Sequence, residues 1–130
     1  MRSEPVWVTA KAVIRANQRA VADTGEPFFL RDRGLLESAL ARPQNLWAYG
    51  ENDLATLAVA VLLGIARNHP FGQGNKRAAF AAAEYFLFLN GWEFTQPDRA
   101  ALGDRVIELI TGNLDEEDFV DLIRGHARKL

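Results

Sequence analysis

The sequence predicts an all-α fold, a compact bundle of about six helices. Apolar residues recur at helical spacing along almost the whole chain, and capping residues precede most of these segments. Strand signals are weak, with residues 28–30 and 92–95 as the candidates for extended structure. The chain has 130 residues, which is long enough to bury a core, and we expect residues 1–130 to form a single domain.

Thr9 is expected to cap the first helix, because its side-chain oxygen can accept a hydrogen bond from an unpaired N–H of the first turn. This helix should run to about residue 22. Its apolar face is formed by Val13, Ala16, Ala20 and Val21. A turn-forming sequence follows, so we expect the helix to end there.

The second helix is predicted to be short. Asp32 precedes it, and it should cover about residues 35–40. Pro43 is expected to stop it, because the residue before a proline is disfavoured in the helical conformation. Residues 42–50 are therefore predicted to form a loop, which carries Trp47 and Tyr49.

The most apolar part of the chain predicts two central helices. The first follows Asp53, whose charge suits a helix N-terminus, and runs to about Asn68. It is apolar nearly all round, as expected for the central helix of a bundle. A proline and two glycines then break the chain, and the second helix covers about residues 75–89 before an Asn-Gly stop.

Two further helices are predicted near the C-terminus. Residues 96–111 are amphipathic, with an apolar side of Leu102, Val106, Ile107 and Ile110. The last helix is expected to begin at Asn113 or Asp115. Acidic residues occupy its first turn and basic residues its end, as the helix dipole favours.

Composition narrows the classes of function. The net charge of −2 gives no basic signature, so direct nucleic-acid binding is not expected. The absence of cysteine excludes disulfides and cysteine metal sites. The N-terminal residues lack the uninterrupted apolar stretch of a signal peptide, and the longest apolar run, residues 54–66, is too short to span a bilayer. We therefore expect a cytoplasmic protein without a membrane segment.

The stretch HPFGQGNKRAAF, residues 69–80, combines the features of an anion-binding turn. Gly72 and Gly74 permit a close backbone approach just before the helix that opens at Asn75, and the free N–H groups of a helix N-terminus attract anions. Lys76 and Arg77 place two cations at the positive end of that helix, which is unfavourable unless an anion is bound.

Three neighbouring residues complete this candidate site. His69 can take up a proton near neutral pH and so could deprotonate a hydroxyl that attacks a phosphate. Arg67 could add a third cation, or form a salt bridge at the end of its helix. Phe71 is expected to anchor the loop in the core. The chemistry indicated is phosphoryl or nucleotidyl transfer; the spacing fits neither a Walker A loop nor a dinucleotide fingerprint.

The motif residues resemble the Fic/Doc family pattern HxFx[D/N][G/A]N[K/G]R. Lys76 matches the Doc (death-on-curing) form, whereas AMP-transferring Fic enzymes usually have glycine there. Those enzymes also commonly carry an arginine where this chain has Phe80. Residues 32–45 and the FLFLNG segment, residues 86–91, look like this family as well, so the resemblance covers roughly residues 6–115.

The resemblance implies an all-α fold with the motif between two central helices. It also implies a toxin of a toxin–antitoxin pair that moves the γ-phosphate of ATP to a threonine of elongation factor Tu and stops translation. The implied neutralising partner is a Phd-like antitoxin with a disordered tail. The resemblance assigns the general base to His69 and phosphate binding to Gly74, Asn75, Lys76 and Arg77, with Arg67 close to the site. Gly72 is added to the phosphate-binding residues by the geometry of the turn alone.

Two points stay open in this resemblance. Gln73 stands where the family has an acidic residue or Asn that helps to hold Mg²⁺, and a neutral amide is a poorer ligand for this hard cation. Because of Gln73, one alternative is a catalytically weakened member that acts by binding; the other is a Fic-type adenylyl or nucleotidyl transferase. Trp47 and Tyr49 form either a flap that guides the target protein or an aromatic cluster over the core.

Overall fold

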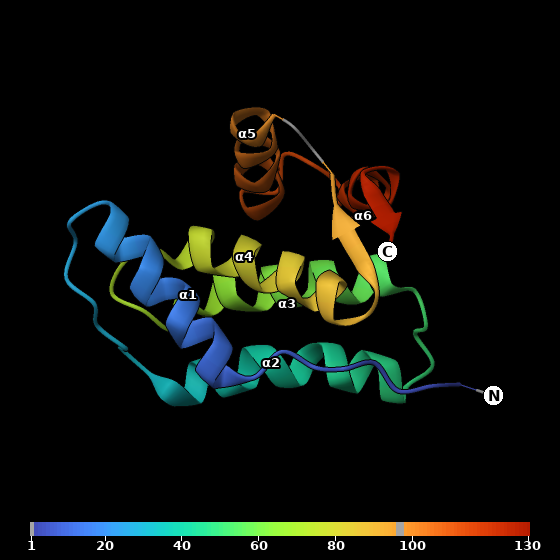
Figure 1. Ribbon diagram of the computed structural model, residues 1–130, viewed down its shortest axis with the longest axis horizontal. Coiled ribbons are helices and arrows are strands. Elements are labelled where there is room, and N and C mark those ends of the chain that lie inside the picture. Colours follow the sequence, from blue (N-terminus) through green and yellow to red (C-terminus); the bar gives the residue numbers. More distant parts are fainter. Residues whose placement is uncertain (1, 96–97) are drawn as a thin grey trace.

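The computed structural model of the chain describes residues 2–95 and 98–130 (Figure 1). Within these residues the protein forms six helices and one two-stranded sheet, which confirms the all-α prediction. The elements in chain order are α1 (Ala10–Asp23), α2 (Arg33–Ala48), α3 (Leu54–Asn68), α4 (Asn75–Leu89), β1 (Trp92–Phe94), α5 (Arg99–Ile110), α6 (Glu116–Gly125) and β2 (Ala127–Lys129).

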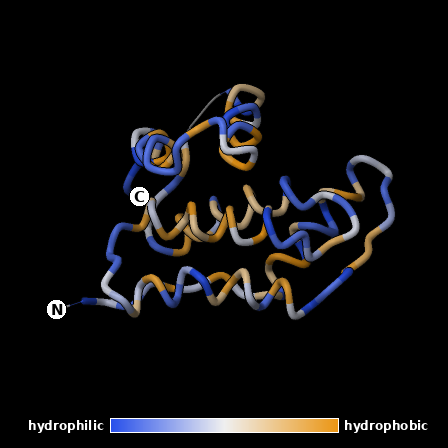
Figure 2. Tube along the Cα trace, turned by 180° about the vertical axis from the view of Figure 1, so that it is seen from behind, coloured by the Kyte–Doolittle hydropathy of each residue, from blue (hydrophilic) through white to orange (hydrophobic). Residues whose placement is uncertain are grey.

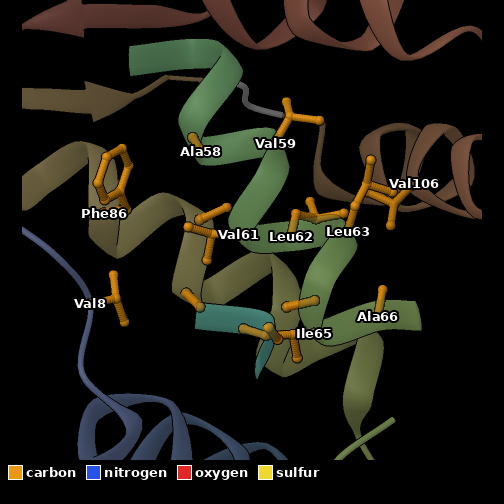
Figure 3. Close-up of a cluster of buried hydrophobic side chains, with 14 of the residues drawn as sticks. Val8, Ala58, Val59, Val61, Leu62, Leu63, Ile65, Ala66, Phe86 and Val106 are labelled. Carbon is orange, nitrogen blue, oxygen red and sulfur yellow. The ribbon is translucent and has the colours of Figure 1, made fainter. Parts of the chain in front are cut away.

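Helix α3 is the centre of the bundle. Every residue from 57 to 66 is buried, because α3 packs against α2, α4, α5 and α6. Figure 3 shows α3 side chains on several sides of the helix, near Phe86 of α4 and Val106 of α5. In Figure 2 hydrophobic colours run along the helices in the middle of the molecule. The nearly uniform apolar character predicted a central helix, and the structure confirms it.

The capping residues begin the helices as the sequence predicts. The side chain of Thr9 accepts a hydrogen bond from the N–H of Ala12, and that of Asp53 accepts one from the N–H of Thr56. The last helix begins after Asp115 rather than Asn113. The predicted start of the preceding helix, Gln96, lies outside the described residues, which place the start of α5 at Arg99.

The predicted loop over residues 42–50 is wrong, because α2 continues through Pro43 to Ala48. A proline has no N–H to donate to the carbonyl of Ala39, four residues earlier. At this point α3 approaches α2 closely: a Cβ built on Gly64 would lie 2.9 Å from the Ala39 oxygen. Pro43 itself is buried on the side of α2 that packs against α3, so packing holds the helix together across the missing bond.

The extended segments are short. β1, predicted from residues 92–95, pairs antiparallel with β2, so that Trp92 lies opposite Lys129. Residues 28–30 form no strand; Leu30 alone makes a bridge, to Phe71. Across the described residues, no helix is both long enough and apolar enough to cross a bilayer.

The close contact of α2 with α3 gives a stability prediction. Gly64→Ala should lower the free energy of unfolding by about 1–3 kcal/mol, because the added methyl group forces the two helices apart. Gly103→Ala is the matched control: a Cβ on this α5 glycine meets nothing within 4 Å, so it should raise stability by up to about 1 kcal/mol. Urea denaturation measures both, and an unchanged stability of Gly64→Ala would contradict the close approach.

Candidate functional site

The loop between α3 and α4, residues 69–74, carries the motif at one end of the bundle (Figure 1). His69 ends α3 with φ 52° and ψ 56°, the left-handed conformation, and among the described residues it is the one non-glycine with a positive φ. This conformation costs an L-residue about 1–2 kcal/mol. Such strain gathers at functional sites, where the surrounding structure imposes it.

The Asn75 side chain holds the loop together. It is 6% exposed. Its Oδ1 accepts a hydrogen bond from the N–H of Phe71 at 3.0 Å, and its Nδ2 donates to the Phe71 carbonyl at 2.9 Å. The resemblance implies a phosphate contact for this residue; in the structure its side-chain amide is bonded within the loop, which leaves its backbone N–H for an anion. The first residue of α4 thus fixes the backbone of the preceding turn.

The same amide orients the His69 ring. Asn75 Nδ2 lies 3.2 Å from His69 Nδ1. Since the pairing with Phe71 fixes which end of the amide carries hydrogens, Nδ1 is the acceptor, and the neutral ring then carries its proton on Nε2. His69 itself is exposed, so the ring is accessible to a substrate.

The N-terminus of α4 is open to an anion. Gly74 provides no side-chain cap, and within the described residues no acceptor contacts the N–H groups of Gly74, Asn75 and Lys76. These groups and the helix dipole attract negative charge. Arg67 and Lys76 are exposed and have no ion-pair or hydrogen-bond partner in the described part of the chain, so both cations are free to meet an anion.

Arg77 is tied to the end of α1. Its guanidinium donates to the carbonyl of Ala20 at 2.8 Å, to the hydroxyl of Thr24 at 3.0 Å and to the carboxylate of Glu26 at 2.6 Å. Hydrogen bonds from Thr24 and then from Arg77 lower the pKa of Glu26. Arg77 therefore contacts protein groups in this state, and a phosphate would have to compete with Glu26 for it.

Two residues absent from the sequence prediction support the loop. Asn17 of α1 is fully buried, and its Nδ2 donates to the Gln73 carbonyl at 2.7 Å. Arg31 caps the end of α3: its Nε donates to the His69 carbonyl at 2.9 Å, near the negative end of the helix dipole. The backbone N–H of Gly72 donates to the Phe29 carbonyl at 2.9 Å. The motif loop is thus held by α1 and by the segment before α2.

Phe71 of the motif loop is buried, whereas the predicted flap residues Trp47 and Tyr49 lie far from this loop. Phe71 is 1% exposed, and its ring lies against that of Phe28 with centroids 6.3 Å apart. Trp47 and Tyr49 lie at the end of α2, next to the start of α3 and thus at the opposite end of the bundle from the motif (Figure 1). Trp47 packs edge-on against Trp7 at 6.5 Å. The segment beside the motif loop is instead the one that carries Phe28 and Phe29.

A groove adjoins the motif between α4 and α5. It has a volume of about 430 Å³, and the residues around it include Lys76, Arg77, Phe80, Arg99, Leu102 and Val106. The Arg99 guanidinium lies over the Phe80 ring, 5.4 Å from its centroid. The groove has the size of a small-ligand site, with cationic and apolar groups together.

The residues around the loop offer few ligands to a metal ion. The Gln73 side chain is exposed, whereas its backbone carbonyl is bonded to Asn17. Among residues 2–95 and 98–130, no three His, Cys, Asp or Glu side chains gather into a group that could hold a metal. A cation at this loop would therefore depend mainly on ligands that a bound phosphate brings.

Comparisons with known proteins identify the family to which the chain is similar. Residues 7–87 match the profile of the Fic/DOC family. A relative named Toxin Doc, from Mycolicibacterium smegmatis (strain ATCC 700084 / mc(2)155), is 39% identical over 104 residues, covering 75% of this chain and 78% of that protein. Protein kinase doc of Escherichia phage P1 is 33% identical over 97 residues, covering 73% and 75%. The matched residues include the whole motif loop.

The strained backbone of His69 predicts the order of stability of its glycine and alanine variants. His69→Gly should be about 1 kcal/mol more stable than His69→Ala, because glycine adopts a positive φ without strain. In the last turn of α3 the order should reverse, with Arg67→Gly about 1 kcal/mol less stable than Arg67→Ala. Chemical denaturation compares the two pairs; an alanine variant at position 69 as stable as the glycine variant would contradict the left-handed assignment.

Proposed function

Because the chain belongs to the Fic/DOC family, we propose that it is a Doc-type toxin of a toxin–antitoxin pair. It transfers the γ-phosphate of ATP to a threonine hydroxyl of elongation factor Tu and thereby inhibits translation. The names of its relatives, a toxin and a protein kinase, support this class of activity. One observation carries the proposal: an exposed imidazole lies beside the open N-terminus of α4, held there by Asn75.

Phosphate binding rests on α4. The N–H groups of Gly74, Asn75 and Lys76 meet no acceptor within the described residues, and a phosphate placed there gains hydrogen bonds and the helix dipole together. Lys76 and Arg67 add charge from exposed positions without losing a partner. Arg77 joins when the phosphate displaces Glu26, so its contribution is reduced by the contact that it gives up.

His69 is the base that accepts the proton of the threonine hydroxyl. The threonine oxygen forms a bond to the γ-phosphorus, the bond from that phosphorus to the β-γ bridging oxygen breaks, and ADP leaves with the electron pair. The hydroxyl proton goes to His69. In the resting ring Nδ1 faces Asn75, so a lone pair reaches the hydroxyl when the exposed ring either turns or exchanges its tautomer with solvent.

Mg²⁺ would be held mainly by the nucleotide. The Gln73 amide is exposed and could contribute one oxygen to the ion. When bound, the ion would neutralise charge on the phosphates.

A second candidate function is nucleotidyl transfer, in which the α-phosphate moves instead. The groove between α4 and α5 adjoins the motif and has a volume of about 430 Å³, within the range of small-ligand sites. Two features favour transfer of the γ-phosphate: Lys76 is present in the motif, and Phe80, engaged by Arg99, stands where nucleotidyl-transferring relatives usually have a second arginine.

The proposed inhibitor is a Phd-like antitoxin whose disordered tail covers the site.

Labelled ATP distinguishes these reactions. The protein is incubated with Mg²⁺, purified elongation factor Tu and ATP labelled at the α or the γ position. We expect label on the factor from γ-labelled ATP alone, and loss of at least about 100-fold of the transfer rate in His69→Ala. Transfer from α-labelled ATP would support the nucleotidyl transferase instead.

Two further results bear on the same assay. No transfer from either label would favour a binding protein, and Gln73→Asp then tests whether a weak metal ligand is the cause, because restored transfer would keep the kinase assignment. When bacterial lysate replaces the purified factor, label on another protein, with none on elongation factor Tu, would overturn the target and leave the reaction standing. Trp47→Ala is the matched control for His69→Ala, since this aromatic lies at the far end of the bundle.

A further inference from the structure

Asn17 is a buried polar residue on the apolar side of α1. It is fully buried, between Val13 and Val21, which are also buried. Its Nδ2 donates to the Gln73 carbonyl at 2.7 Å, a contact that spans 56 positions of the chain. A Cβ built on Gly74 would lie 3.0 Å from the same nitrogen. The side chain of Asn17 therefore lies directly against the peptide that joins Gln73 to Gly74.

This contact sets the direction of one N–H group. In a trans peptide the carbonyl and the following N–H point in opposite directions, and the described residues contain no cis peptide. Since the Gln73 carbonyl points at Asn17, the Gly74 N–H points away from α1. It accordingly joins the unpaired N–H groups of Asn75 and Lys76 at the start of α4.

Stability alone does not explain an asparagine here. Its Oδ1 is buried and accepts no hydrogen bond from the described residues. An unsatisfied buried oxygen is unfavourable, and an apolar side chain of similar size would avoid it. A residue that makes the protein less stable than another side chain would at the same position is typical of a functional site.

We propose that Asn17 is a positioning residue for phosphate binding: its amide holds the Gln73–Gly74 peptide so that the Gly74 N–H faces the bound phosphate. The inference rests on the proposed function, since it assigns Asn17 to the phosphate site of that reaction. In this role Asn17 does not contact the substrate itself. The effect of removing the amide should therefore appear in the affinity for phosphate groups and not in the affinity for the nucleoside.

Calorimetric titration of the full chain with ATP and with adenosine, both in the presence of Mg²⁺, tests this role. Asn17→Leu removes the donor at nearly constant volume. We expect its Kd for ATP to rise about 10-fold or more, the loss expected for one hydrogen bond to a charged group, with the Kd for adenosine unchanged. The urea midpoint should change little, because the loss of the hydrogen bond to the Gln73 carbonyl is offset by removal of the unsatisfied oxygen.

Val13→Ala is the matched control, since Val13 is a buried α1 residue one turn before Asn17 whose apolar side chain forms no hydrogen bond. It should lower the urea midpoint and leave both affinities unchanged. If Asn17→Leu does not fold, Asn17→Ala replaces it in the same comparison. An unchanged ATP affinity, or an equal loss for ATP and adenosine, would overturn the positioning role alone. Wild-type protein that binds ATP no more tightly than adenosine would overturn the phosphate site and, with it, both proposals.

Discussion

The Asn75 carboxamide makes the hydrogen bonds that the motif loop cannot make for itself. A chain that reverses between two buried helices leaves backbone groups unpaired, and buried unpaired groups are costly. Asn75 satisfies both the N–H and the carbonyl of Phe71 and also reaches the His69 ring. The left-handed conformation of His69, the burial of Phe71 and the open end of α4 all depend on this loop geometry.

The electrostatics of the site follow from which groups are already paired. Lys76 and Arg67 remain exposed, whereas Arg77 is bonded to Ala20, Thr24 and Glu26 at the end of α1. The site therefore offers an anion both free N–H groups and the exposed charges of Lys76 and Arg67. Arg77 adds a further cation only if its contact with Glu26 is broken. An anion is attracted mainly by the fixed backbone donors, which lose little freedom on binding.

Local signals predicted the helices well and the supports of the site poorly. Thr9 and Asp53 are caps that act within three residues, and periodicity identified the central helices. Pro43 was misjudged because the packing that keeps α2 intact comes from Gly64 on another helix. Arg31 and Glu26 have partners 38 and 51 positions away, so no local pattern marks them. Asn17 is marked in the sequence as a polar residue on an apolar helix face, but its partner, Gln73, lies 56 positions away.

Residue-resolved amide hydrogen exchange tests the central claim about this loop most directly. The N–H of Phe71, bonded to Asn75, should exchange slowly in the free protein. The N–H groups of Gly74 and Lys76 should exchange fast and become slow when ATP and Mg²⁺ are added. Fast exchange at Phe71 would contradict the Asn75 clamp. Unchanged exchange at Gly74 and Lys76 at saturating ATP would contradict the phosphate site.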